Sequence, residues 1–101
     1  DGVVKFNFDE LCDRNLGSED YICIANTCDF IFIKDLPNFK ENNSNQQQRF
    51  ITLIDILYEK KIPLMITSNI DLKLINSSKS LVETFKRTVS RLYELTSMSY
   101  N

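Results

Sequence analysis

The strongest constraint on the fold is a strand, helix, strand pattern between residues 30 and 67. Residues 30–33 form a continuous apolar run that Pro37 ends, which is typical of a strand buried on both faces. A second strand is predicted at 62–67, where Pro63 falls among the first residues and its missing N–H costs little. The segment between them repeats apolar residues at helical spacing: Phe50, Leu53, Ile54, Leu57 and Tyr58. Two strands joined by a helix are parallel by default, with a right-handed crossover.

The flanking segments extend this pattern at both ends. Residues 3–8 alternate between apolar and polar side chains and predict a further strand. Ser44 and Gln47 have the spacing of a capping box at the start of the central helix. The last helix is expected to turn one apolar face inward, carrying Val82, Phe85, Val89, Leu92 and Thr96. The predicted fold is α/β, a two-layer or three-layer parallel-type sheet with strands at about 3–8, 30–34 and 62–67 and helices at about 19–27, 44–60 and 81–97.

The size of the chain fits one domain, residues 1–101. With 101 residues, 43% of them hydrophobic, it can bury one modest core. The first residue is Asp1, and the strand pattern begins at Val3. We therefore expect a fragment of a larger protein.

Composition argues against several classes of function. The net charge is −2 and the lysines are scattered, so nucleic acid is not an expected partner. No apolar stretch approaches the roughly 20 residues that span a bilayer, and no targeting segment is recognisable. Cys12, Cys23 and Cys28 include no CxxC pair and the chain has no His, so no metal site is predicted.

Three motifs cover nearly the whole chain. The first runs F-x-x-LC-x-x-x-LG-x-x-DY from Phe8 to Tyr21, the second is QRFITLIDILY from Gln48 to Tyr58, and the third runs F-x-RTVSRL-x-E from Phe85 to Glu94. In order and spacing they resemble the C-terminal region of the ZapE-like, or AFG-one-like, ATPases, a branch of the AAA+ P-loop proteins. Gln48 and Leu95 stand where that family has Arg and Met, and Asp29 where a His is common.

The resemblance implies the C-terminal part of a P-loop NTPase-like fold. It also implies an ATP-driven machine that remodels or helps dispose of other proteins, mitochondrial in eukaryotes and cytoplasmic in bacteria. ATP and Mg²⁺ would be used by the full-length parent, whose upstream ATPase domain is the expected partner of this segment. An oligomer is possible in the parent, and the client protein is unknown. The chain contains no G-x-x-x-x-G-K-[ST] motif and only two glycines, so it is not expected to hydrolyse ATP alone.

Three arginines are the candidate nucleotide-sensing residues, and no catalytic or metal-binding residue is predicted in this chain. Arg87 and Arg91 lie one turn apart on the outward face of the last helix, where two guanidinium groups could hold a phosphate. The alternative is a solvated ion-pair ladder starting from Glu83. Arg49 lies near a helix start, where a cation is disfavoured, so it is explained by an anionic partner, by a salt bridge or by simple exposure.

Three polar residues are weaker candidates. Asp55 shares its helix with the apolar stripe and is expected to bond a residue of the next element more easily than a backbone donor or Arg49 two turns away. Ser68 and Asn69 follow a buried strand, where a polar tip could orient an attacking water, but turn and cap roles are preferred. Two functions therefore stand: an ATPase subdomain whose arginines address nucleotide, and a non-catalytic interaction or packing module of α/β fold.

Overall fold

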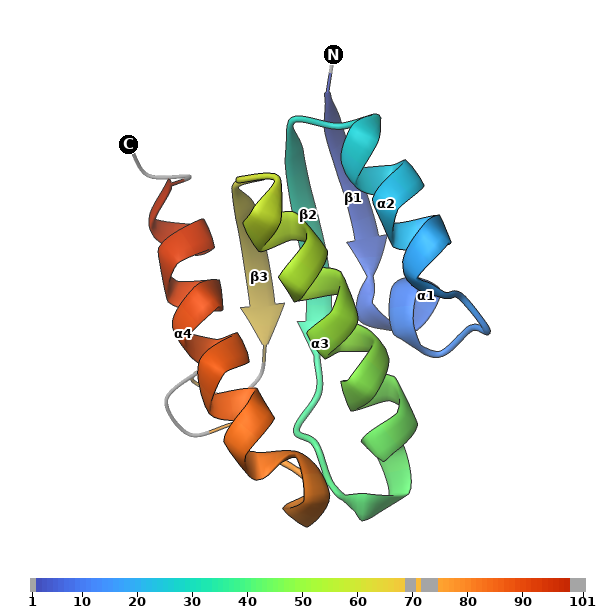
Figure 1. The fold of residues 1–101 in the computed structure, drawn as a ribbon, viewed down its shortest axis with the longest axis vertical. Coiled ribbons are helices and arrows are strands. Elements are labelled where there is room, and N and C mark those ends of the chain that lie inside the picture. The colour runs from blue at the N-terminus through green and yellow to red at the C-terminus, as the bar shows by residue number, and fades with distance from the viewer. Residues whose placement is uncertain (1, 69–70, 72–74, 99–101) are drawn as a thin grey trace.

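The structure is a computed structural model that describes residues 2–68, 71 and 75–98. Its strands are β1 (Val3–Asn7), β2 (Phe30–Leu36) and β3 (Leu64–Ser68). Its helices are α1 (Phe8–Cys12), α2 (Ser18–Asn26), α3 (Ser44–Glu59) and α4 (Val82–Met98), and short 3-10 turns, η1 (Glu41–Asn43) and η3 (Lys79–Leu81), precede the last two. Figure 1 shows α2, α3 and α4 standing side by side over one face of the strands.

The three strands form one parallel sheet in the order β1-β2-β3. The chain passes from β1 through α2 to β2, and from β2 through α3 to β3, and both helices lie on the same side of the sheet (Figure 1). Two right-handed crossovers that step in the same direction across a sheet must place their helices on one face. The predicted α/β fold with a parallel sheet is confirmed, and the described residues form its two-layer version.

Most predicted elements lie within two residues of the observed ones. Two strand boundaries differ because of hydrogen bonding in the sheet. β2 continues to Leu36, which pairs with Ser68 beyond an irregularity at which Asp35 takes a positive φ of 63°. β3 begins at Leu64, after Pro63, whose carbonyl still accepts a bond from the Ile31 N–H.

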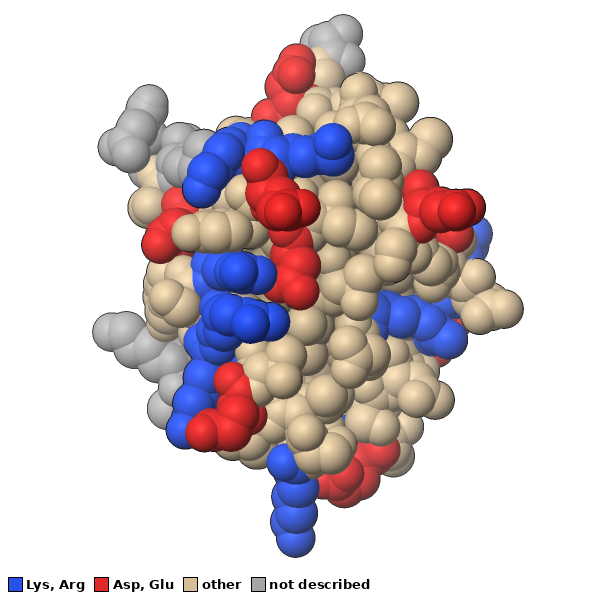
Figure 2. Space-filling model, viewed as in Figure 1, with Lys and Arg blue, Asp and Glu red and all other residues tan. Residues whose placement is uncertain are grey.

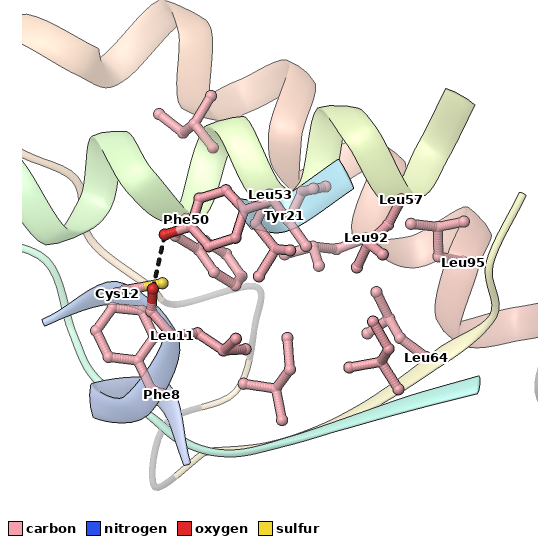
Figure 3. Close-up of a cluster of buried hydrophobic side chains, with 14 of the residues drawn as sticks. Phe8, Leu11, Cys12, Tyr21, Phe50, Leu53, Leu57, Leu64, Leu92 and Leu95 are labelled. Atoms are coloured by element: carbon pink, nitrogen blue, oxygen red, sulfur yellow. Dashed lines mark hydrogen bonds between the residues drawn. The ribbon is translucent and has the colours of Figure 1, made fainter. Parts of the chain in front are cut away.

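One buried cluster holds the two layers together. Figure 3 shows leucines of α3 and α4 meeting Leu64 of β3, with the α1 residues at the other end of the core. Phe39 is fully buried among three other rings, with centroid distances of 5.6 Å to Phe8, 5.9 Å to Phe50 and 5.4 Å to Phe85. This aromatic group ties α1, α3 and α4 to the segment that follows β2, and such ring pairs add to the stabilisation from burial.

The prediction that the strand at residues 30–33 is buried on both faces is wrong. Ile31 and Ile33 are fully buried under the helices, whereas the alternate residues Phe30 and Phe32 are only half-buried. The continuous apolar run could not reveal this difference, because the second face of the sheet has no cover among the described residues.

The predicted inner face of the last helix is partly wrong. Phe85 and Leu92 are buried as expected, but Val82 is 39% exposed, and Thr88 and Leu95 are buried in addition. The buried stripe of α4 is therefore rotated relative to the prediction. Val82 and Val89 instead line an open groove of about 600 Å³ between α4 and residues 75–77, together with Tyr93.

Gln47 does not act in a capping box, so that prediction is also wrong. α3 has Asn43 at its N-cap with no side-chain cap bond. Gln47 is fully buried; its Nε2 donates to Ser77 Oγ at 2.7 Å, and its Oε1 accepts from the Ser78 N–H at 3.1 Å. The side chain is thus the polar connection between α3 and the segment leading into α4.

Candidate functional site

The candidate site lies where α3 and α4 pack side by side. Figure 2 shows Lys and Arg side chains gathered over α4 on this face of the molecule. α4 contributes Lys86, Arg87 and Arg91, and its first turn carries Glu83. The buried apolar residues of α3 and α4 hold the two helices in place. Asp55 of α3 and Arg91 of α4 are thereby brought together where the helices meet.

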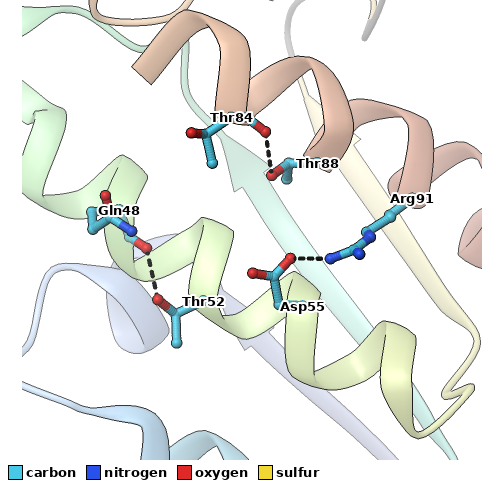
Figure 4. A network of polar contacts seen from close by, with 6 residues as sticks. All are labelled: Gln48, Thr52, Asp55, Thr84, Thr88 and Arg91. Atoms are coloured by element: carbon cyan, nitrogen blue, oxygen red, sulfur yellow. Dashed lines mark hydrogen bonds and ion pairs between the residues drawn. The ribbon is translucent and has the colours of Figure 1, made fainter. Parts of the chain in front are cut away.

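Arg91 is bound to Asp55 of α3 rather than facing outward, which corrects its predicted orientation. Its Nη1 lies 2.5 Å from Asp55 Oδ1, and the two side chains are 27% and 38% exposed (Figure 4). The guanidinium carbon also lies 4.7 Å from the centroid of the Tyr58 ring. Asp55 thus bonds a residue of α4 and not one of β3, the next element, where its partner was expected, and the pair joins α3 to α4.

Glu94 completes the polar contacts around the Tyr58 ring. It raises the pKa of the Tyr58 phenol, first through a side-chain hydrogen bond and then through its negative charge, against the opposing effect of Arg91. Tyr58 was predicted only as part of the apolar stripe of α3. Its position one turn after Asp55 on the same helix was the available signal that it could contact the same partner.

Arg87 differs from Arg91 in its surroundings. It is exposed, and among the described residues it forms no hydrogen bond or ion pair. The predicted ladder from Glu83 through Arg87 to Arg91 does not form, because Glu83 pairs with Lys86 at 2.9 Å and Arg91 pairs with Asp55. The structure therefore leaves one arginine of α4 available to an external anion and holds the other in place.

Arg49 is separate from these two arginines. It comes from the second turn of α3, and its Nη1 donates to the Cys12 carbonyl at 3.0 Å. This contact is neither the predicted salt bridge nor simple exposure. A carbonyl at the end of α1 is a partner that the sequence pattern could not identify, since it depends on α1 folding against α3.

Ser68 is the last residue of β3, so its predicted turn role is wrong. Its Oγ donates to the Leu36 carbonyl at 3.0 Å, and beside it Thr67 Oγ1 accepts from the Asp35 N–H at 3.1 Å. Both hydroxyls reinforce the irregular end of the β2–β3 pairing. Asn69, the other residue of that hypothesis, lies outside the described residues.

The three cysteines lie in different surroundings. Burial raises the pKa of Cys12 to about 12, and Cys12 lies near the Tyr21 hydroxyl, which donates to the Leu11 carbonyl at 2.6 Å (Figure 3). Cys28 is also buried, whereas Cys23 is exposed. Within the part of the chain that the structure describes, no cluster of three possible metal ligands occurs. Nor does any helix there have the length and apolarity to cross a membrane.

Comparison with known proteins settles the family. The sequence profile of the family described as AFG1-like ATPase matches residues 1–101. The chain belongs to the AFG1-like ATPase family. The resemblance carried by the three motifs is thereby confirmed for this AFG1-like chain.

Curated relatives of this AFG1-like chain are much longer than it is. It is 35% identical to Lactation elevated protein 1 homolog B of Danio rerio over 67 residues, which cover 66% of the chain and 13% of that protein. It is 29% identical to Cell division protein ZapE of Escherichia coli strain K12 over 98 residues, which cover 97% of the chain and 26% of that protein. No solved structure matches the chain.

Proposed function

We propose that this chain is the C-terminal part of an ATP-hydrolysing machine that remodels other proteins or takes part in their quality control. The match of the AFG1-like family to residues 1–101 is the observation that carries the proposal. The chain spans about a quarter or less of the relatives named above, so ATP and Mg²⁺ would be bound mainly by the remainder of the longer protein. The proposed location is mitochondrial in a eukaryote and cytoplasmic in a bacterium.

The residues of this chain support a contributing role rather than a complete ATPase site. The sequence has no phosphate-binding loop, and of its two glycines neither has the positive φ that a tight backbone cradle for phosphates often uses. What the chain does offer is the exposed guanidinium group of Arg87 on α4. A guanidinium group can bind two phosphate oxygens at once, so an arginine placed there could stabilise a phosphoryl group from outside the cradle.

Within this function, Arg87 is the proposed nucleotide contact. Its support is that it is exposed and forms no hydrogen bond or ion pair with the described residues, whereas Arg91 is held by Asp55 and Tyr58. Arg91 then fixes α4 against α3 and so sets where Arg87 points. Arg49 has no part in this proposal, because the Cys12 carbonyl already holds its guanidinium group.

The test compares Arg87→Ala with Lys86→Ala in the full-length protein. Lys86 is the adjacent exposed cation of α4, so it is a matched control for the loss of one positive charge. Turnover and nucleotide affinity are measured for both. If Arg87 stabilises the reacting phosphoryl group, its removal should slow turnover by at least about tenfold, while the Lys86 variant stays near the unaltered protein. Equal turnover in the two variants would reject the nucleotide role.

A second candidate function is a non-catalytic packing or interaction module. The Arg91–Asp55 pair favours it, since that contact lies between two helices of the same chain. A comparison of Arg91→Ala with Asp55→Asn tests whether Arg91 acts only through its contact with Asp55 or also contacts nucleotide. Under the packing reading, Arg91→Ala and Asp55→Asn lower the melting temperature alike and change turnover alike. If Arg91 also contacted nucleotide directly, Arg91→Ala would lower nucleotide affinity and Asp55→Asn would not.

A further inference from the structure

One face of the sheet carries apolar side chains that no helix among the described residues covers. Strand alternation and register place Val3, Phe30, Phe32 and Met65 on the face opposite the helices, since Val3 pairs with Phe30 and Phe32 pairs with Met65. Figure 1 shows α2, α3 and α4 on the other side. The uncovered side chains are adjacent in three neighbouring strands, so they form one surface, which we call the open sheet face.

The exposure of these residues is unusual for a parallel sheet. Val3 is 62% exposed, and Phe30, Phe32 and Met65 are each only half-buried. Parallel sheets are found almost only where both faces are covered, and their strands then read as continuous apolar runs. Residues 30–33 are such a run. The sequence of β2 is therefore that of a doubly covered strand, although the described helices cover it once.

The charges on the open sheet face indicate what kind of surface could cover it. Lys5 lies on this face with its Nζ 5.5 Å from the centroid of the Phe32 ring. Lys34 is two residues after Phe32 in β2, so its side chain lies on the same face of the sheet. Among the described residues, neither lysine forms an ion pair with a carboxylate. A matching surface would carry apolar side chains opposite Phe30 and Phe32, and carboxylates within reach of the two lysines.

We propose that the open sheet face is covered by an amphipathic helical layer from another segment of the same polypeptide. The length of the relatives supports this occupant: this chain corresponds to 26% of ZapE from Escherichia coli and to 13% of the Danio rerio protein. Such proteins have most of their residues outside the matched region. A second helical layer would turn the two-layer unit into the three-layer arrangement in which parallel sheets are normally found. The proposal depends on family membership and not on the role of Arg87.

Cysteine accessibility in the full-length protein tests the proposal. Val3→Cys and Lys5→Cys place a thiol on the open sheet face, at residues that are exposed in this structure. The native Cys23 on α2 is exposed and shows that the reagent reaches the folded protein. Thiol modification is followed by peptide mass mapping, in the native state and in urea. A covered face should slow modification of the two introduced cysteines by at least about tenfold relative to urea.

Two results would overturn the proposal. The first is modification of both introduced cysteines in the native protein at rates close to those in urea, which means that the face is open. The second is protection that grows with protein concentration, which assigns the face to a second copy of the protein. Phe32→Glu provides an independent measurement, since it should lower the melting temperature of the full-length protein clearly more than Ile22→Glu on the exposed side of α2. Equal shifts would count against the covering layer.

Discussion

Replacing Gln47 with Ala should destabilise the chain far more than replacing its neighbour Gln48. Gln47 is fully buried and bonds both Ser77 Oγ and the Ser78 N–H. Gln48 is exposed, and no hydrogen bond of its side chain to another described residue is found. The two positions share a helix and a residue type, so helix propensity cancels in the comparison.

The magnitude follows from what the Gln47 substitution leaves behind. Ser78 is 1% exposed, so its N–H would become a buried donor without a partner, which costs about 1–3 kcal/mol. Loss of the bond to Ser77 adds about 1 kcal/mol. We therefore expect Gln47→Ala to lower the free energy of unfolding by about 2–4 kcal/mol, against less than about 0.5 kcal/mol for Gln48→Ala.

Urea unfolding followed by far-UV circular dichroism measures both changes. Gln47→Leu adds a useful control, because it keeps much of the side-chain volume while removing both hydrogen bonds. If the polar contacts matter, Gln47→Leu should remain destabilised by at least about 1 kcal/mol. A Gln47→Ala variant within about 0.5 kcal/mol of Gln48→Ala would refute the reasoning, since the buried bonds would then contribute nothing.

Three more predictions concern the core, the thiols and the helix pair. Phe39→Ala should lower the free energy of unfolding in urea by about 3–5 kcal/mol, because the ring is fully buried among other rings. Tyr93→Ala, at a position that is 41% exposed, should lower it by less than about 1 kcal/mol, and comparable losses would contradict this packing. Burial raises the pKa of Cys12 from 9.0 to about 12, so the neutral thiol stabilises the fold below pH 9. This contribution to the free energy of unfolding should be lost as pH rises from about 9 towards 12, by up to about 1.4 kcal/mol per pH unit. An unfolding series of Cys12→Ala over that range should show a shallower decline, and parallel curves would exclude the thiol as the cause. A double-mutant cycle on Arg91→Ala and Asp55→Asn should give a coupling free energy of about 0.5–1 kcal/mol. This coupling should fall with added salt, because both side chains are partly exposed. Zero coupling would mean that the contact does not stabilise the fold.

Local patterns were sufficient to predict the three strands and the three longer helices of this fold, but not α1. The alternation in residues 3–8 and the apolar run at 30–33 identify strands, and the stripe from Phe50 to Tyr58 identifies α3. These signals lie within single turns or strands, where the period of the backbone alone decides which side chains share a face. The parallel pairing of β2 and β3 then followed from the helix that joins them.

Which polar residues meet was decided only by packing between distant elements. Asp55 and Arg91 are 36 residues apart, and Gln47 and Ser78 are 31 apart. No local period relates such pairs. The sequence could list Arg87, Arg91 and Arg49 as candidates, yet the fold gives them three different environments.

The sequence by itself determined the family, the α/β class and the order of the strands and longer helices along the chain, because each of these depends on motifs or on short-range apolar spacing. Only the tertiary structure decided the rotation of α4, the pairing of Arg91 and the burial of β2 on a single face. An apolar side chain has the same local pattern whether it contacts a helix of this chain or a surface outside it. Its burial is a property of the assembled layers, and it cannot be read from its neighbours in sequence.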